Sequence, residues 1–402
     1  MRTQVGIVGA GPAGLVLAHL LHRAGIDSVV LENHSREHIE RRIRAGVLEH
    51  GTVDLLTEVG LAERLHRERL VHHGIELLFD GVGHRIPLTE LAGRSISIYG
   101  QHELVKDLVA ARLSTGRPLL FSVSDVRVSD VDGARPVVWF ADSAGRPVDL
   151  ECDLVAGCDG YHGVCRPSIP AGFLRVFERD YPYAWLGVLA QAPPSSEELI
   201  YAYHERGFAL HSMRSPHITR LYLQVSPDED LDKWPDERIW AELRTRLARD
   251  AGFDLAEGPI LEKSVAAMRS FVVEPMRFGR LFLAGDAAHI VPATGAKGLN
   301  LAIADVSVLA RAIVDFYAGD PAGLDAYSAR CLRRVWRVQH FSWWMTSMLH
   351  RPDDGDPFTH RLQLSQLRYV ASSRAAATSL AENYVGLPLD LASADLDGRT
   401  MT

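Results

Sequence analysis

Three glycines near the start of the chain, Gly9, Gly11 and Gly14, have the GxGxxG spacing of a dinucleotide-binding turn. In such a turn the first glycine permits the tight bend, the second lets the backbone approach a pyrophosphate, and the third lets the following helix pack on the strand. An apolar run at 4–8 precedes the turn, and a second run ends at Glu32, whose carboxylate can accept the ribose hydroxyls. These features predict a βαβ unit that binds a dinucleotide.

Two short motifs farther along the chain indicate which dinucleotide is bound. Residues 283–289 (LAGDAAH) read as a strand ending in a Gly-Asp pair, with Asp286 as its acid. Residues 156–160 (AGCDG) carry an Asp-Gly pair at Asp159. Both resemble motifs of flavoprotein hydroxylases, in which the aspartate of the Gly-Asp pair binds the ribityl chain of the flavin. A plain NAD dehydrogenase has no reason for these motifs, so together they favour FAD.

Longer segments extend this resemblance from residue 1 to about residue 390. The chain resembles the class A flavoprotein aromatic hydroxylases, of the 4-hydroxybenzoate 3-monooxygenase type. The matching segments are 42–49 (RIRAGVLE), 269–275 (RSFVVEP), 294–300 (TGAKGLN), 341–346 (FSWWMT) and 382–388 (ENYVGLP).

The resemblance implies a defined reaction. An enzyme of this family would hydroxylate 4-hydroxybenzoate to 3,4-dihydroxybenzoate with NAD(P)H and O2, through a flavin C4a-hydroperoxide. Two alternatives stay open: a hydroxylase of the same fold that acts on another phenolic acid, and a non-catalytic protein that uses the FAD-domain fold for protein contacts. The intact Gly-Asp and Asp-Gly pairs argue against the second alternative.

A substrate site for an aromatic acid needs a group that holds the carboxylate. Ser212 and Arg214 are two residues apart in an expected strand, so they share a face, and an arginine can hold a carboxylate through two hydrogen bonds. Tyr222 would lie opposite Ser212 if the loop between them closes a hairpin, and Tyr201 would lie beside them after the preceding turn. The resemblance implies that Ser212, Arg214 and Tyr222 bind the carboxylate and that Tyr201 binds the phenolic hydroxyl.

A phenolate is a better nucleophile than a phenol, but free phenols ionise only near a pKa of ~10. The site must therefore lower this pKa and provide a route for the proton. The resemblance implies that Tyr384 passes the proton onward from Tyr201 and that His72 stands at the exit of the path.

Two positions depart from the family pattern. The family has two consecutive prolines before the Thr-Gly pair, whereas this chain has Pro292 followed by Ala293. The family contact here is a backbone carbonyl near the substrate hydroxyl, so Ala293 keeps the carbonyl but loses the fixed φ of proline. Tyr203 stands where the family usually has a smaller polar residue, and its role does not follow from the sequence.

Residues 295–300 predict a helix N-terminus at the pyrimidine edge of the flavin, where the helix dipole would stabilise negative charge on reduced flavin by about 0.3–2 kcal/mol. Lys297 is expected to add positive potential there. The motifs and the resemblance together predict the flavin contacts Gly9, Gly11, Gly14, Glu32, Arg42, Arg44, Val47, Gln101, Asp159, Asp286, Gly295, Lys297, Gly298, Leu299 and Asn300.

The reaction needs an external reductant, yet the chain has no second GxGxxG motif. In the family NAD(P)H has no domain of its own and approaches across the surface. The matching residues here are Arg44, His162, Arg166 and Arg269. Glu37 and Glu40 would repel the 2′-phosphate of NADPH, which favours NADH, whereas Arg36, Arg41 and Arg42 argue for NADPH.

The elements that must position these residues come from scattered segments of the chain. The fold class is expected to be α/β, with a Rossmann-type FAD-binding domain, an inserted mixed or antiparallel sheet domain for the substrate, and a helical C-terminal part. We expect the FAD domain to comprise 1–70, 96–180 and 270–320, the substrate domain 72–95 and 181–269, the helical part 321–390, and a tail 391–402. Residues 40–70 are expected to be helical.

Composition excludes several other classes of protein. The 402 residues carry a formal net charge of −8, so no overall positive field exists for nucleic acid or an anionic membrane. The chain has no apolar run long enough to span a bilayer and no signal-peptide pattern. Its four cysteines form no CxxC pair, which indicates reduced thiols in a cytoplasmic protein, and its histidines lack metal-ligand spacing. The resemblance implies a homodimer.

Overall fold

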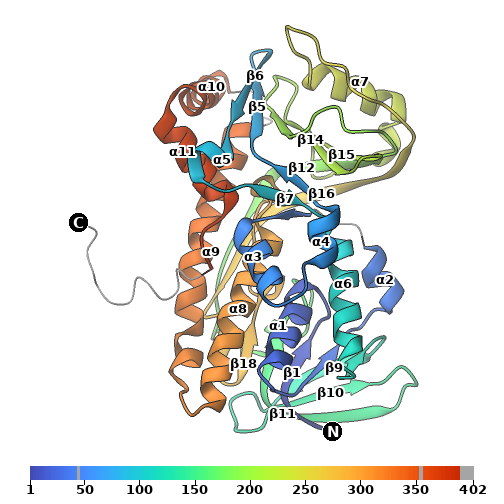
Figure 1. Cartoon of the computed structure of the whole chain (residues 1–402), viewed down its shortest axis with the longest axis vertical. Coiled ribbons are helices and arrows are strands. Elements are labelled where there is room, and N and C mark those ends of the chain that lie inside the picture. The colour runs from blue at the N-terminus through green and yellow to red at the C-terminus, as the bar shows by residue number, and fades with distance from the viewer. Residues whose placement is uncertain (43–45, 353–355, 390–402) are drawn as a thin grey trace, which may run out of the picture.

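The strand that precedes the glycine turn, β1 (Arg2–Val8), lies inside a mixed sheet. In the computed structural model, which describes residues 1–42, 46–352 and 356–389, β1 pairs in parallel with β2 (Ser28–Leu31) and β11 (Pro147–Gly157). β11 pairs in parallel with β18 (Leu281–Leu283) on its other side. Strands from three distant parts of the chain, β1, β11 and β18, therefore lie side by side, and the two acidic motifs follow the carboxyl ends of β11 and β18 (Figure 1).

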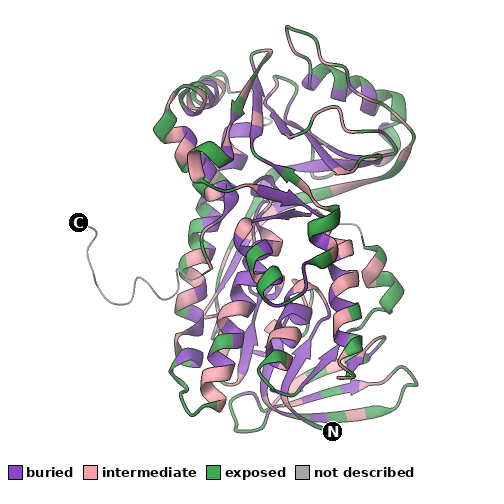
Figure 2. Cartoon of the chain, viewed as in Figure 1, coloured by how far each residue is buried: buried purple, intermediate pink, exposed green. Residues whose placement is uncertain are grey.

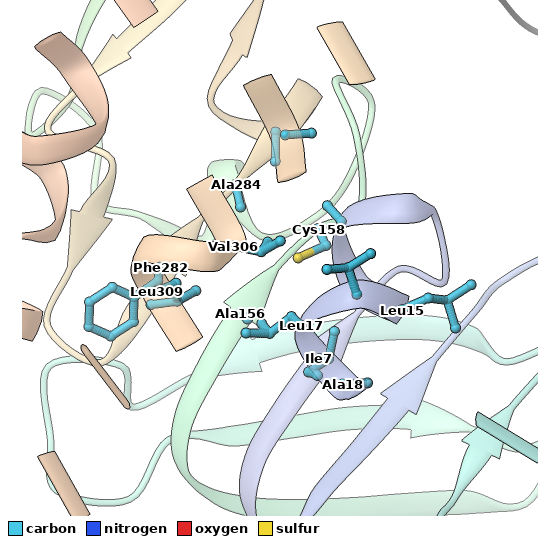
Figure 3. Packing of buried hydrophobic residues seen from close by; sticks show 14 of the residues in the cluster. Ile7, Leu15, Leu17, Ala18, Ala156, Cys158, Phe282, Ala284, Val306 and Leu309 are labelled. Atoms are coloured by element: carbon cyan, nitrogen blue, oxygen red, sulfur yellow. The ribbon is translucent and has the colours of Figure 1, made fainter. Parts of the chain in front are cut away.

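Short strands complete this first sheet and helices cover it. The remaining strands are β8 (Leu119–Leu120), β9 (Ser124–Ser129), β10 (Val137–Ala141) and β17 (Arg277–Phe278). The helices are α1 (Pro12–Arg23), α6 (Gln101–Ser114), α8 (Gly298–Tyr317) and α9 (Ala322–Leu349), with α1 packed between α6 and α8. Figure 3 shows the buried core, in which Ile7 and Leu15 lie with Ala156, Phe282 and Val306.

A second sheet forms the upper part of the molecule in Figure 1. Its strands, in spatial order, are β19 (His289–Ile290), β16 (Ile260–Glu274), β12 (Arg175–Ala190), β15 (Ile218–Val225), β14 (Ala209–Ser215), β13 (Leu199–Ala202), β5 (Ile75–Phe79) and β6 (Val82–Ile86). Side chains alternate between its two faces because successive residues of a strand point in opposite directions. Ile200 and Ala209 join the core under α7 (Asp236–Arg246), whereas Tyr201 and Leu210 face the C-terminal helices.

The C-terminal helices close the second face of this sheet. They are the end of α9, α10 (Pro357–Ser372) and α11 (Arg374–Val385). Their buried residues Leu367, Leu380 and Tyr384 share one core with the sheet. In Figure 2 the strands of this sheet are largely buried, whereas α10 and α7 each carry exposed residues.

The prediction of a helical segment over residues 40–70 is partly wrong. The segment contains the end of α2 (Arg36–Arg41), α3 (His50–Glu58) and α4 (Glu63–Glu68), but also β3 (Val47–Leu48) and the start of β4 (Leu70–His72). Both strands pair with β7 (Ile96–Ile98) in a small third sheet, with α5 (Leu88–Ala92) nearby in sequence. Gly46 makes this possible, because a Cβ at this position would come within 2.0 Å of the Tyr99 carbonyl oxygen.

Other elements fall close to their expected positions. The helix predicted at residues 295–300 begins at Gly298, and the C-terminal part of the chain is helical as expected, with α9, α10 and α11. The described residues also form four short 3-10 turns: Arg166–Ser168, Leu231–Lys233, Gly285–Ala287 and Ala293–Gly295. Within the described ranges, no helix combines the length and apolar character needed to cross a bilayer.

Candidate active site

The glycine turn between β1 and α1 has the geometry that close packing requires. Gly9 has φ of +105°, and a Cβ there would lie 2.3 Å from the Cys158 carbonyl oxygen. A Cβ on Gly14 would lie 2.0 Å from the Gly9 carbonyl oxygen. Around the Cβ position of Gly11, in contrast, no heavy atom lies within 4 Å. Gly9 and Gly14 therefore serve the fold, and Gly11 leaves the helix N-terminus open to a ligand.

The carboxylate of Glu32 lies at this same turn. Its Oε2 accepts the Ala10 amide at 2.9 Å and its Oε1 accepts the His34 amide at 2.9 Å. The N-terminus of α1 has Gly11 as its N-cap and no side-chain cap, so its first N–H groups are free to face an anion. A carboxylate fixed beside an open helix N-terminus suits the ribose and pyrophosphate of a dinucleotide.

The Asp-Gly motif carries a buried oxygen that lacks a protein partner. Oδ2 of Asp159 accepts the Cys165 amide at 2.9 Å, but its Oδ1 is buried without a hydrogen bond among the described residues. Burial raises the pKa of this carboxyl, and the Cys165 amide opposes the rise. Such an orphaned acceptor fits a bound polar ligand. Asp286 lies in the 3-10 turn that follows β18, in the adjacent strand end of the sheet.

The segment before α8 combines an open helix end with backbone strain. Ala296 adopts a left-handed conformation at φ of +53°, which is unfavourable for a residue with a Cβ and is typical of functional sites. α8 then begins at Gly298 without a side-chain cap, and the space around the Gly298 Cβ position is open to 4 Å. These features suit the edge of a flavin ring. Leu299 is partly buried against the sheet core, and a Cβ on Gly295 would press on Ser342 Oγ at 2.8 Å.

Lys297, which the sequence predicts to add positive potential at this helix end, is buried in an ion pair. Its ammonium group is 2% exposed, donates to Glu49 Oε1 at 2.9 Å and donates to the Tyr384 carbonyl at 2.7 Å. Burial lowers the pKa of Lys297, and Glu49 opposes that shift. Glu49 also pairs with Arg334 at 3.5 Å, so the cluster of Lys297, Glu49 and Arg334 keeps a net positive charge, which adds to the positive end of α8.

Asn300 connects the same segments. Its side-chain oxygen accepts the Glu49 amide and the Thr52 hydroxyl, both at 2.9 Å, and its amide group donates to the Val47 carbonyl at 2.9 Å. The first turn of α8 is thereby fixed to β3 and α3. Asn300 thus positions the predicted cofactor contact Val47, and Lys297 is joined to the same cluster through Glu49, which the sequence did not single out.

Three predicted substrate residues lie on one face of the second sheet. Across β13, β14 and β15, Tyr201 pairs with Leu210 and Leu210 pairs with Tyr222. The prediction that Tyr222 lies directly opposite Ser212 is wrong, because Ser212 pairs with Arg220 and the partner of Tyr222 lies two residues earlier in β14. The hairpin turn between β14 and β15 is tighter than assumed, with Ser215 paired to Ile218, and this moves Tyr222 to the diagonal position.

Arg214 lies on this face beside Ser212. Its guanidinium donates to the Met213 carbonyl at 3.0 Å and to Ser212 Oγ at 3.4 Å, while its Nε is buried without a partner in the described part of the chain. Burial lowers the pKa of Arg214, and the adjacent Tyr222 hydroxyl opposes this. Among the described residues, no carboxylate forms an ion pair with Arg214. A buried, incompletely bonded guanidinium favours an anionic ligand such as a carboxylate.

The hydroxyl groups of Tyr201 and Tyr384 lie 2.6 Å apart, and both side chains are 1% exposed. β13 supplies Tyr201 and α11 supplies Tyr384, so the contact depends on how α11 packs against the sheet. Burial raises the pKa of both tyrosines, and for Tyr201 the hydrogen bond from Tyr384 opposes that rise. Both groups therefore stay protonated near neutral pH and can each donate one proton while accepting another.

His72 is buried on β4, and neither of its ring nitrogens has a hydrogen-bond partner among the described residues. Burial lowers its pKa to about 4. Tyr203, which the sequence left without a role, donates its hydroxyl to Gln363 Oε1 at 3.0 Å and also contacts the His360 ring of α10. Tyr203 therefore joins the substrate sheet to the C-terminal helices.

Three of the residues predicted to meet the nicotinamide coenzyme surround one aromatic ring. The guanidinium groups of Arg166 and Arg269 lie 4.8 Å and 4.9 Å from the centre of the Tyr161 ring, and the His162 ring meets its edge at 4.9 Å. Arg166 also lies 4.8 Å from the Phe271 ring. Tyr161 is a central member of this group that the sequence did not single out. The fourth predicted residue, Arg44, lies outside the described residues.

The remaining predicted positions are placed as follows. Gln101 is the first residue of α6, and Arg42 is exposed at the end of α2. Ala293 is exposed, and its carbonyl accepts the Ala296 amide at 2.9 Å. In α2 the opposite charges pair internally: Arg36 with Glu40 at 2.6 Å and Arg41 with Glu37 at 2.8 Å. No group of three metal-ligating side chains occurs in the portions 1–42, 46–352 and 356–389.

Comparison with known proteins gives concordant findings. A family model described as an FAD binding domain matches residues 2–342. The p-hydroxybenzoate hydroxylase of Acinetobacter baylyi is 49% identical over 397 residues, which cover 98% of each chain. A 3-(3-hydroxy-phenyl)propionate/3-hydroxycinnamic acid hydroxylase of Paraburkholderia xenovorans is 28% identical over 85% of this chain and 55% of its own. The crystal structure of p-nitrophenol 4-monooxygenase from Pseudomonas putida shares the fold, with a TM-score of 0.78, 18% identity, and coverage of 94% of this chain and 97% of that one.

Proposed function

This chain belongs to the FAD-dependent flavoprotein aromatic hydroxylases, and from that membership we propose that it hydroxylates 4-hydroxybenzoate to 3,4-dihydroxybenzoate with NAD(P)H and O2. The observation that carries the proposal is the buried face on which Arg214 and Ser212 lie near Tyr222 and the Tyr201–Tyr384 pair. One end of this face suits a carboxylate and the other suits a phenol. This pairing of a carboxylate-binding end with a phenol-binding end on one buried face supports a para-hydroxylated benzoate as the substrate.

The flavin is proposed to lie between the two sheets. Gly11, Glu32, Asp159 and the first turn of α8 would hold it, as their open or unpartnered polar groups suggest. When bound, FAD supplies the hydride acceptance and oxygen activation that no side chain can perform. In this division residues 1–70, 96–180 and 270–320 serve the flavin, 72–95 and 181–269 serve the aromatic acid, and 321–390 cover both.

The role proposed for the substrate sheet is orientation. The Arg214 guanidinium and the Ser212 hydroxyl would hold the carboxylate, with Tyr222 as a further donor. The carboxylate and the para hydroxyl lie at opposite ends of the rigid benzoate ring. With the carboxylate held by Arg214 and Ser212, the phenolic oxygen would reach Tyr201. Removal of water by the apolar face strengthens each of these hydrogen bonds.

The role proposed for the tyrosine pair is proton transfer. Tyr201 would accept the phenolic proton as it donates its own to Tyr384, so neither tyrosine needs to ionise. The raised pKa values of both hydroxyls are consistent with this relay. His72 is proposed as the exit, through solvent that would bridge its unpartnered ring nitrogens. Ala293 is proposed to offer its carbonyl to the substrate hydroxyl.

The coenzyme is proposed to dock on the surface around Tyr161, beside His162, where Arg166 would offer its positive charge to a pyrophosphate. Arg269 pairs with Glu178 at 3.4 Å and with Asp180 at 3.5 Å, and it would exchange these ion pairs for the pyrophosphate. Arg44, which lies outside the described residues, belongs to the same proposal. The internal ion pairs of α2 leave little net charge to repel or attract a 2′-phosphate. Because the paired arginines Arg36 and Arg41 offer little positive charge for a 2′-phosphate, we propose NADH as the favoured coenzyme, to be tested against NADPH.

A second candidate function is hydroxylation of a related phenolic acid. The observation that favours it is Ala293, whose φ is not fixed by a proline ring and whose carbonyl already accepts the Ala296 amide. A homodimer is also proposed, because Trp336 and Trp343 of α9 and Phe358, Leu362 and Tyr369 of α10 expose large apolar side chains. The four buried free thiols are consistent with a cytoplasmic enzyme.

The proposed function is tested by NADH and NADPH oxidation with the purified flavoprotein, with and without 4-hydroxybenzoate, and with identification of the aromatic product. We expect strong stimulation and one 3,4-dihydroxybenzoate for each NAD(P)H consumed. Stimulation without hydroxylated product would make 4-hydroxybenzoate an effector and favour a related phenol as substrate. A flavin-loaded protein that 4-hydroxybenzoate does not stimulate would refute the substrate assignment. A kcat/KM for NADPH much above that for NADH would refute the coenzyme preference.

A further inference from the structure

We propose that His350 is a positioning residue that holds Trp185 in place as the wall behind the substrate-carboxylate site. This inference rests on the proposed hydroxylation of an aromatic acid, because it assigns a determinant of substrate affinity within that site. The sequence motifs did not identify His350. Within the described residues, its side chain makes no hydrogen bond to the hydroxyl of Tyr201 or of Tyr384.

His350 is the C-cap of α9, directly after the long helix that runs beside the flavin domain. Its side chain is 1% exposed. The indole Nε1–H of Trp185 donates to His350 Nε2 at 2.6 Å, and His350 Nδ1 lies 3.0 Å from the Thr346 carbonyl oxygen. Because Nε2 must accept the indole proton, the ring proton lies on Nδ1 and is donated to Thr346. Burial lowers the pKa of His350 to about 3, so Nε2 remains an acceptor at neutral pH.

The imidazole also sits within an aromatic enclosure. It stacks on Tyr183 with ring centres 4.8 Å apart and lies 4.4 Å from the Phe208 ring. Trp185 in turn stacks on Phe208 at 5.3 Å and lies 4.7 Å from Tyr222. The indole ring is therefore shared between His350 on one side and a predicted substrate residue on the other.

The backbone of β12 and β15 explains why Trp185 reaches Tyr222. Tyr222 pairs with Gly187, and Trp185 pairs with Gln224, so Trp185 and Tyr222 are diagonal neighbours on the same face. Gly187 has no side chain of its own to fill the position directly opposite Tyr222. The rotamer of Trp185 consequently decides how much room the Tyr222 ring has.

Helix α9 ties this wall to the loop at the proposed flavin edge. One turn before His350, Thr346 Oγ1 donates to Thr294 Oγ1 at 2.8 Å, and Thr294 is fully buried in the turn that precedes α8. On the other side, Gln363 Nε2 donates to the His350 carbonyl at 2.6 Å. His350 thus lies where the substrate sheet, α9 and α10 meet, and its position is fixed from three directions.

Loss of the acceptor would leave the indole N–H of Trp185 buried without a partner. The indole would then turn to find another acceptor, and Tyr222 would lose the ring against which it packs. The expected consequence is weaker binding of an aromatic carboxylate, with a smaller effect on the oxygen-transfer steps. This outcome separates a positioning role from a role in catalysis.

Two isosteric substitutions test the proposal. In His350→Gln the side-chain oxygen can take the place of Nε2 and accept the Trp185 proton, whereas in His350→Asn the amide reaches only the Nδ1 position. We expect the Kd of the oxidised holoenzyme for 4-hydroxybenzoate, measured by titration calorimetry, to rise about 10-fold in His350→Asn, the usual effect of one unsatisfied buried donor. His350→Gln should stay within about 3-fold of the wild type, and kcat should change less than KM in both variants.

His211→Asn is the matched control. His211 is also fully buried in this sheet and accepts a hydrogen bond, from the Ser195 amide at 3.1 Å, but it faces the core under α7 rather than the substrate. Its replacement should leave the Kd unchanged. Equal Kd values for wild type and His350→Asn would overturn the inference, as would equal weakening by His350→Asn, His350→Gln and His211→Asn. A wild-type holoenzyme that does not bind 4-hydroxybenzoate would instead overturn the proposed function, and the inference with it.

Discussion

At the scale of single residues, the hydrogen-bonded hydroxyls of Tyr201 and Tyr384 are the groups best placed to transfer a proton. Two phenols at 2.6 Å in an apolar enclosure form a hydrogen bond whose proton can move in either direction, depending on what else each oxygen contacts. The same burial that raises both pKa values also keeps each oxygen from ionising at neutral pH. The pair is therefore suited to moving a proton without holding a charge.

The Tyr201→Phe variant tests this role. It removes the hydroxyl that would meet the substrate phenol but keeps the ring in the core, so we expect binding close to wild type and a kcat reduced by about 100-fold. Tyr181→Phe is a suitable control, because Tyr181 lies in the same domain and bonds Ser270 at 3.1 Å instead. Steady-state turnover and product analysis would measure the effect. A Tyr201→Phe turnover near that of the wild type would contradict the relay.

Single residues also show where sequence reasoning reaches its limit. Arg214 and Ser212 could be identified because a strand places alternate residues on one face, whatever the register. The exact partner of Tyr222 could not, since it depends on a hairpin turn whose length the sequence leaves open. The burial of Lys297 against Glu49 joins residues 248 positions apart, and no local pattern indicates such a contact.

At the scale of elements, different glycines of the turn from β1 into α1 serve packing of the fold and binding of the ligand. A Cβ on Gly14 meets a backbone oxygen at 2.0 Å, which cannot move without distorting β1, whereas a Cβ on Gly11 meets open space. The glycine turn could be predicted from the sequence because each glycine of the motif meets a different steric requirement, which fixes the spacing. The short strands β3 and β4 were missed because two- and three-residue strands lack a period.

Alanine substitutions at these two glycines should therefore behave differently. We expect Gly14→Ala to lower the free energy of unfolding by about 2 kcal/mol or more, as overpacking against backbone does. Gly11→Ala should leave the stability of the flavin-free protein almost unchanged and weaken FAD binding, because its methyl group enters the space of the ligand. Denaturant unfolding of the apoprotein and fluorescence titration with FAD would separate the effects. Equal losses of stability would show that Gly11 also packs within the fold.

At the scale of the whole molecule, buried neutral histidines make stability depend on pH. Burial lowers the pKa of His72 and of His211 to about 4 and that of His350 to about 3. The unfolded chain takes up these protons near pH 6.5, but the folded chain takes them up only near the lowered values. Stability is therefore full above pH 6.5 and is lost as pH falls toward 4. His289, whose pKa Asp305 raises against the opposing effect of burial, contributes in the opposite direction.

We expect the free energy of unfolding to fall between pH 7.5 and pH 5 by roughly 2 kcal/mol for each of the three histidines, less the opposing contribution of His289. Chemical denaturation at both pH values would measure the difference. His211→Gln removes one of the three groups and should make the fall about 2 kcal/mol smaller. A free energy of unfolding that stays constant over this range would show that these side chains are hydrated in the folded protein.

The arrangement of the first sheet has a consequence for how the enzyme is made. β1 leaves the ribosome first, but its neighbour β11 begins at Pro147 and the strand beyond it at Leu281. At a translation rate of about 5–20 residues per second, the opening strand waits for tens of seconds before its sheet can be completed. A nascent chain that ends before α8 lacks one wall of the cofactor site. If the first turn of α8 (Gly298–Tyr317) holds the flavin as proposed, we expect stable FAD capture only after this helix has left the ribosome.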